Sequence, residues 1–239
     1  MLRLPEERDN NLESDGEAEV GMRCWLEYGF FSLVLAAMVP MAVQAQDRCG
    51  SLLPETARHQ DRQDDYLDPH PAARRHLKLV ADHHFRPQIR RFDGHPMYIM
   101  ENLDYTLLHF PNYHEALYAV SQFERRNGGR LPQKAGWRWR RSAECYFVRA
   151  IRFRPEDGVV RMLYGIHLHK GGKLEQALEQ YKTGLELIPR SSELNYNLGL
   201  LYYDLKKYEL AKKYATTAYE LGYPLPGLKK LLEKVGHWP

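Results

Sequence analysis

The chain has 239 residues, with 34 Lys and Arg against 31 Asp and Glu, so its formal net charge is only +3. A hydrophobic content of 44% is enough to build a core and excludes wholesale disorder, while a mean hydropathy of −0.60 excludes a polytopic membrane protein. The near balance of charge argues against a nucleic-acid partner, and three cysteines are too few for a disulfide-dense scaffold.

The first 45 residues predict an export signal preceded by an acidic extension. Residues 1–21 carry seven acids and two arginines, whereas the start of a signal peptide is positive. Residues 28–45 are uncharged and end in Val-Gln-Ala, which suits signal peptidase. We therefore expect 1–21 to precede the physiological start at Met22, residues 22–45 to be a signal peptide, and the mature chain to be exported, to a bacterial periplasm. The alternative is an uncleaved signal anchor in the inner membrane.

Residues 46–96 follow as a lead segment that starts irregularly and then contains short helices, the first expected over 71–85. After signal cleavage two cysteines remain, Cys49 and Cys145. An oxidising compartment permits a disulfide between them. Two separate thiols are the alternative.

Residues 97–156 read as degenerate helical repeats. Apolar spacing predicts helices over 97–110 and 113–126, followed by a turn-rich insertion over 127–136 and a further helix up to Pro155.

Residues 157–225 contain two copies of one pattern, displaced by 34 residues. The small residues that align at this displacement are Gly165 with Gly199, Ala177 with Ala211, and Gly184 with Ala218. Each copy predicts two helices joined by a tight polar turn and closed by a proline, which cannot continue the second helix. Small side chains at the aligned positions would let the two helices cross closely.

These residues resemble the tetratricopeptide repeat. The first copy carries Gly165, Ala177, Tyr181, Gly184 and Pro189. The second carries Gly199, Tyr202, Ala211, Ala218 and Pro224, with Ala215 in place of the aromatic residue. The resemblance implies an all-α fold, a short TPR-like α-solenoid of antiparallel helix pairs, with a capping helix in 226–239.

The resemblance also implies a function, because the first helix of each pair in this family lines a concave groove that takes a peptide or helix of a protein partner. The residues placed in that groove are Met162, Ile166, His169, Tyr196, Leu200 and Tyr203. We therefore expect an exported, non-catalytic adaptor. The alternative for this surface is that the N-terminal helices cover it as core.

A basic segment suggests a second surface. Residues 125–154 hold ten basic residues and one acid, and four arginines share one helical stripe: Arg138, Arg141, Arg149 and Arg152. This stripe predicts contact with an anionic envelope surface, either lipid or polysaccharide. The alternative is an internal ion-pair network with the acidic residues of 96–124.

Catalytic signals are absent from the sequence. It has no glycine-rich phosphate loop, no nucleophile elbow and no metal-ligand spacing, so we expect no enzyme, cofactor or metal. A small hydrolase built from His and Asp residues is the least favoured function.

Overall fold

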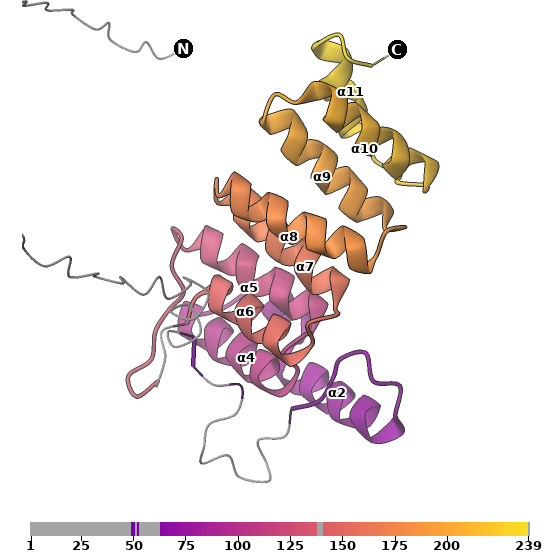
Figure 1. The fold of residues 1–239 in the computed structure, drawn as a ribbon. Coiled ribbons are helices and arrows are strands. Elements are labelled where there is room, and N and C mark those ends of the chain that lie inside the picture. The colour runs from indigo at the N-terminus through magenta and orange to yellow at the C-terminus, as the bar shows by residue number, and fades with distance from the viewer. Residues whose placement is uncertain (1–48, 51, 53–62, 138–140, 239) are drawn as a thin grey trace, which may run out of the picture. The chain divides into compact units, whose positions relative to one another are not determined.

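The computed structural model describes residues 49–50, 52, 63–137 and 141–238 (Figure 1). Within these ranges there are ten α-helices and no strand, all in the compact unit Val39–Pro239. The predicted extension and signal peptide lie outside the described residues.

The N-terminal half of the described chain is a series of five helices. They are α2 (Pro71–His84), α3 (Pro87–Arg90), α4 (Pro96–His109), α5 (His114–Arg126) and α6 (Ala143–Phe153). The first three of these helices begin with a proline, whose missing N–H removes no helical hydrogen bond at the first position and whose φ suits a helix. Helix α4 contacts α2 and α5, and α5 contacts α6 and α7.

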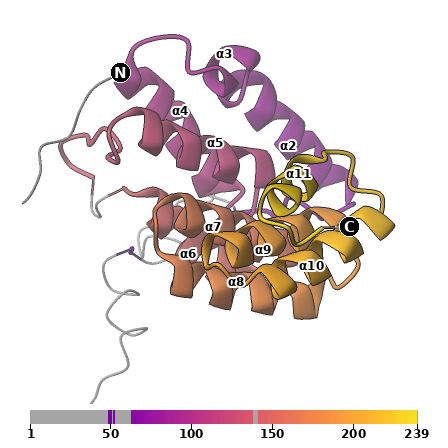
Figure 2. The same cartoon turned by 90° about the horizontal axis from the view of Figure 1, so that it is seen from above.

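The C-terminal half consists of two helix pairs and a short final helix. The helices are α7 (Gly158–Lys170), α8 (Leu174–Leu187), α9 (Ser192–Asp204), α10 (Tyr208–Glu220) and α11 (Gly227–Lys234). Figures 1 and 2 show α7 beside α8 and α9 beside α10. Together with the absence of strands in the described ranges, these pairs confirm the predicted all-α fold of adjacent helix pairs.

Side chains next to the helices fix where they begin. The Asp157 carboxylate accepts hydrogen bonds of 3.1 Å from the backbone N–H groups of Val159 and Val160 at the start of α7. The Ser191 hydroxyl accepts one of 3.1 Å from Leu194 N–H at the start of α9. Such N-caps satisfy donors that the first helical turn leaves unpaired.

Helix α11 has no side-chain cap of its own. Its first-turn N–H groups are taken by neighbouring helices instead. The hydroxyl of Tyr196 on α9 accepts from Leu228 N–H at 3.1 Å, and that of Tyr219 on α10 accepts from Lys229 N–H at 3.0 Å. The final helix is therefore joined to the last pair by polar contacts as well as by its buried leucines, Leu228 and Leu232.

The turns within the two pairs share one backbone conformation. Gly172 between α7 and α8 has a φ of +75°, and Lys206, 34 residues later between α9 and α10, has a φ of +57°. A lysine is thus kept in a left-handed conformation that glycine adopts at no steric cost. The 34-residue period is therefore present in the backbone as well as in the sequence.

The helices of the two pairs pack at a distance that only small residues permit. A Cβ on Gly165 would lie 2.5 Å from two ring carbons of Tyr181 and 3.1 Å from its Cγ. A Cβ on Gly199 would lie 2.6 Å from a methyl carbon of Leu228. Since Tyr181 is fully buried, its ring has no space into which to move.

We expect Gly165→Ala to lower the free energy of unfolding by up to about 2 kcal/mol. Overpacking a core costs about 1–3 kcal/mol, which exceeds the gain in helix propensity of about 1 kcal/mol. Urea denaturation measures the difference. In a Tyr181→Leu background the cost of Gly165→Ala should shrink, because the opposing ring is gone. An equal cost in both backgrounds would show that this contact is not the cause.

Candidate protein-binding surface

The six residues predicted to line a groove lie on the first helices of the two pairs, α7 and α9, but differ in accessibility. Met162 and Ile166 on α7 are buried, with exposed fractions of 3% and 7%, and Tyr196 on α9 is buried at 8%. His169, Leu200 and Tyr203 are half-buried. Of these six, Leu200 and Tyr203 are the apolar side chains that another molecule can reach, whereas the His169 side chain is 13% exposed.

Tyr196 is occupied by its own chain. Its ring stacks on Tyr223 with centroids 4.0 Å apart, and its hydroxyl accepts from Leu228 N–H. A Cβ on Gly227 would come within 2.8 Å of that hydroxyl. The absence of a side chain at Gly227 therefore leaves room for the Tyr196 hydroxyl at the start of α11. The alternative considered from the sequence was that N-terminal helices cover the predicted groove. Tyr196 is instead covered by the C-terminal helix α11.

The accessible part of the two first helices is called here the α7–α9 face. Its residues are His169, Lys170, Leu200, Tyr203 and Asp204. His169 Nε2 lies 2.7 Å from a carboxylate oxygen of Asp204, which joins α7 to α9. Tyr203 packs against Tyr208 of α10, with ring centroids 5.5 Å apart. The face combines two accessible apolar side chains with a positioned pair of polar groups.

The predicted arginine stripe does not form an exposed surface. Arg141 is 7% exposed and Arg149 is 2% exposed, so neither guanidinium can reach an external anion. Arg152 is half-buried, and Arg138 lies outside the described residues. The prediction of a solvent-facing stripe is therefore wrong for Arg141, which precedes α6 and contacts Asp104, and for Arg149, which lies on α6 and contacts backbone carbonyls of the lead segment.

Arg141 belongs to an internal network with the acidic region before it. Its Nε donates to Asp104 on α4 at 3.0 Å, and the Tyr146 hydroxyl donates to the same carboxylate oxygen at 2.5 Å. Burial, followed by the negative charge of Asp104, raises the pKa of Tyr146 well above its ordinary value. The alternative of an ion-pair network with residues 96–124 is thus confirmed at this position.

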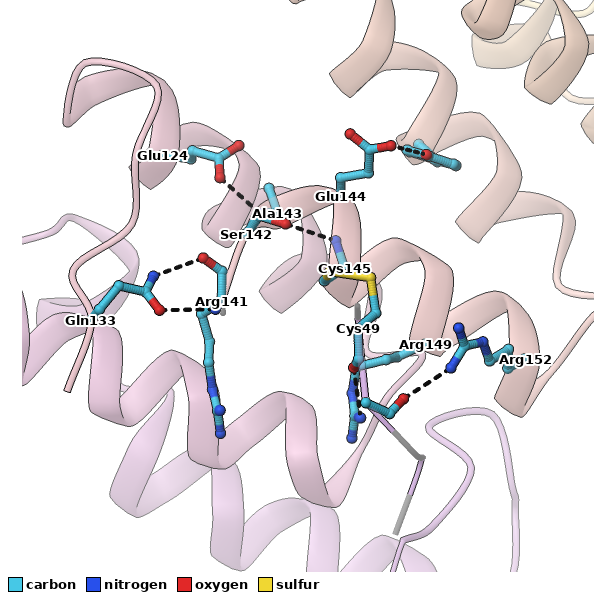
Figure 3. The surroundings of a disulfide bond; sticks show 12 residues. Cys49, Glu124, Gln133, Arg141, Ser142, Ala143, Glu144, Cys145, Arg149 and Arg152 are labelled. Carbon is cyan, nitrogen blue, oxygen red and sulfur yellow. Dashed lines mark hydrogen bonds between the residues drawn. A yellow bond between two sulfur atoms is a disulfide. The ribbon is translucent and has the colours of Figure 1, made fainter. Parts of the chain in front are cut away.

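A disulfide joins Cys49 to Cys145, as predicted, with Cα atoms 5.0 Å apart (Figure 3). The bond closes a loop across a sequence separation of 96 residues. In a chain-entropy description, removing that freedom from the unfolded chain stabilises the fold by about 4–5 kcal/mol.

Two arginines of α6 reinforce this attachment (Figure 3). Arg149 donates to the carbonyl oxygens of Cys49 and Leu52, at 3.4 and 2.8 Å, and Arg152 donates to that of Gly50 at 2.9 Å. Backbone carbonyls of the lead segment therefore replace the external anion that the sequence predicted for these side chains.

A second polar cluster, centred on Asp157, was not identified from the sequence. Besides capping α7, its carboxylate lies 2.9 Å from Nε2 of His114 and accepts from the Asn112 side chain at 3.2 Å. Asn112 also donates to Asp65 at 2.8 Å. Burial alone would raise the pKa of Asp157, but the hydrogen bond and charge of His114 outweigh it, and the pKa is lowered. The cluster ties the lead segment, the start of α5 and the start of α7 together.

A Ser–His–Glu arrangement lies between α5 and α7. The Ser121 hydroxyl is 3.0 Å from Nδ1 of His167, and Nε2 of His167 is 3.9 Å from Glu124. Arg125 donates to the Ser121 oxygen at 2.6 Å, so the hydroxyl proton points to a neutral Nδ1. Burial, then the nearby charge of Arg125, lowers the pKa of His167 to about 4.

This arrangement does not suit hydrolysis. Ser121 is 2% exposed, so a substrate has no access to its oxygen, and a histidine with so low a pKa is a weak general base at neutral pH. We interpret the three residues as a buried hydrogen-bonded contact between helices.

The described residues include no cluster of three or more His, Cys, Asp or Glu side chains arranged to hold a metal ion. Nor does any helix in the described ranges have both the length and the apolar character needed to cross a bilayer.

The paired helices and the accessible face on their first members define a helical-repeat protein of the kind that acts as a binding scaffold. Residues 166–206 match the family model described as TPR repeat. The match covers the first helix pair from Ile166 and the first helix of the second pair, which agrees with the tetratricopeptide-repeat resemblance that the repeated glycines, alanines and prolines predicted for this part of the chain.

Solved structures of similar arrangement come from several bacteria. Pseudomonas aeruginosa PilF is 20% identical, with a TM-score of 0.49 over 68% of each chain. MamA of Desulfovibrio magneticus RS-1 is 21% identical, with a TM-score of 0.47 over 67% of this chain and 86% of that one. The TPR protein TTC0263 of Thermus thermophilus is 20% identical, with a TM-score of 0.46 over 69% and 83%. A comparison with curated protein sequences gives no match.

We expect the free energy of unfolding to decrease as the pH is lowered from about 6.5 to 4. Protonation of His167 contributes to this decrease. The unfolded chain protonates this histidine near 6.5, whereas the folded chain does so only at about 4. The unfolded state therefore binds more protons in this window, and His167 costs up to about 3 kcal/mol by pH 4. Urea titrations from pH 8 to pH 4 measure the slope.

His167→Asn should flatten that slope, because an amide can accept from Ser121 but does not titrate. The exposed His83→Asn is the matched control and should keep the wild-type profile. A wild-type slope in the His167 variant would contradict the assignment.

Proposed function

We propose that this protein is an exported interaction scaffold that binds an extended or helical segment of a partner protein on the α7–α9 face. The observation that supports the proposal is the accessibility of Leu200 and Tyr203 beside the His169–Asp204 pair, on the first helices of two consecutive pairs. Apolar anchors next to orienting polar groups are the usual composition of a peptide-binding surface.

The buried neighbours contribute rigidity. Met162 and Ile166 of α7 are buried and have little freedom to move, and Tyr196 is fixed by α11. A partner would therefore meet a preformed face, and binding would not have to order these side chains. Of the six residues predicted to bind the partner, the buried Met162, Ile166 and Tyr196 thus support the surface. The other three, His169, Leu200 and Tyr203, are those that would contact the partner.

We expect Tyr203→Ala combined with Leu200→Ala to weaken capture of the principal partner at least about tenfold, since truncated apolar anchors each cost about 1–2 kcal/mol at such sites. Photo-crosslinking in intact cells from Lys170, followed by mass spectrometry, identifies the partner, and titration of the purified pair measures affinity.

Leu210→Ala on α10 is the matched control, because Leu210 is 38% exposed on the second helix of its pair. It should leave affinity unchanged. Equal binding by the Tyr203/Leu200 variant and the wild type, with both folded by circular dichroism, would contradict the proposal.

Export is part of the proposal, and the disulfide supports it. A bond between Cys49 and Cys145 persists in an oxidising compartment and is rare in the cytosol. Cys49 lies four residues beyond the predicted cleavage site, so the mature chain would carry its disulfide almost at its first residue. The bacterial periplasm fits both features.

We expect the protein recovered from the periplasmic fraction to begin at Gln46 and to contain no free thiol. Intact mass spectrometry with and without reduction measures both properties, since reduction of one disulfide adds two hydrogens. A chain that retains the apolar residues 28–45 would support the inner-membrane anchor instead, and a reduced Cys145 would count against the oxidising compartment.

A further inference from the structure

The loop before α11 presents an exposed leucine on a fixed backbone. Leu225 is 58% exposed and lies between Pro224 and Pro226. The Tyr219 hydroxyl donates to the Leu225 carbonyl at 3.3 Å and accepts from Lys229 N–H at 3.0 Å. The backbone is therefore attached to α10 on both sides of the loop while the leucine side chain stays in solvent, where it adds nothing to the core.

Exposed lysines follow this leucine on α11. Lys229, Lys230 and Lys234 of α11 are all exposed, and within the described ranges none of them forms a salt bridge. Residues 206–238 carry seven lysines against three glutamates and contain no arginine. One of the glutamates, Glu209, is paired with His237.

An aromatic side chain completes the cluster. Trp238 contacts Tyr219 edge to face, with centroids 5.7 Å apart, and the Lys229 ammonium lies 5.9 Å from the Trp238 ring. A projecting leucine, a tryptophan and unpaired lysines within one short segment are the composition of elements that lie at a membrane–water interface.

We propose that this C-terminal cap, comprising Leu225, α11 and Trp238, binds the surface of an anionic bilayer. Leu225 enters the headgroup region, and the lysines face anionic headgroups. The absence of arginine favours a bilayer over an acidic protein, because lysine offers point charge to a diffuse field, whereas arginine suits the directed pairing of fixed carboxylates. This surface is separate from the α7–α9 face and from the arginines of α6.

Sedimentation of the full chain with vesicles tests the proposal. Vesicles of phosphatidylcholine alone are compared with vesicles containing about one-third phosphatidylglycerol. We expect Lys229→Gln with Lys230→Gln to lower binding to the anionic vesicles at least about tenfold, at roughly fivefold per lysine near an anionic surface. Leu225→Ser should lower it severalfold.

Matched variants control for charge and exposure. Leu79→Ser removes a leucine that is also 58% exposed, on α2, and Lys182→Gln with Arg190→Gln removes two exposed positive charges, from α8 and from the turn that follows it. Both should bind like the wild type. Losses equal to those of the cap variants would show a general effect of charge or hydrophobicity and overturn the proposal.

A local readout separates the cap from the apolar residues 28–45, which all variants share. Tryptophan emission is quenched with brominated phosphatidylglycerol in the wild type and in Trp238→Phe, and the difference isolates Trp238. We expect this difference to show quenching. An unquenched Trp238, or binding of the cap to polyglutamate but not to vesicles, would overturn the proposal, the latter by assigning the surface to an acidic protein.

Discussion

The close contact between helices at glycine is the constraint on which the C-terminal half depends. At Gly165 the buried Tyr181 ring occupies the volume that any side chain would need, and at Gly199 the same is true of Leu228. The two contacts differ in kind. The first joins the helices of one pair, whereas the second joins α9 to α11, so the final helix lies against the last pair through the second repeat's glycine.

The N-terminal half solves the same packing problem by other means. The insertion over 127–136 separates α5 from α6, so the short turn found in the later pairs is missing. In its place are the Cys49–Cys145 bond, the Arg141–Asp104 pair and the Asp157 cluster. A buried ion pair contributes little net stability, because desolvation offsets its attraction, but losing either partner would be costly. These contacts therefore specify which segments lie together more than they add stability, whereas the disulfide does both.

Sequence reasoning recovered whatever is local or periodic. The 34-residue displacement predicted the helix pairs, their small-residue contacts and even the matching turns, because each rests on residues near one another in the chain. The disulfide was predicted from the two cysteines that would remain after the expected signal cleavage. The burial of Arg149 and its hydrogen-bond partners could not be predicted in the same way. Arg149 lies on α6 as expected, but the carbonyls that accept its hydrogen bonds come from Cys49 and Leu52, about a hundred residues away, in a segment without periodicity. Asp157 escaped notice for the same reason, since its partners Asn112 and His114 lie 45 and 43 residues earlier in the chain.

The tyrosines of the last pair show why burial alone does not decide a residue's role. Helix α11 starts after a proline and has no capping side chain, so the N–H groups of Leu228 and Lys229 need acceptors. Phenylalanine at 196 would fill the same volume but leave the buried N–H of Leu228 without an acceptor. Tyr196 looked like a partner-binding aromatic because the family pattern places it on the inner helix. Its hydroxyl instead accepts a hydrogen bond from the first turn of α11. This contact buries Tyr196 away from the accessible face and fixes α11 and the loop before it.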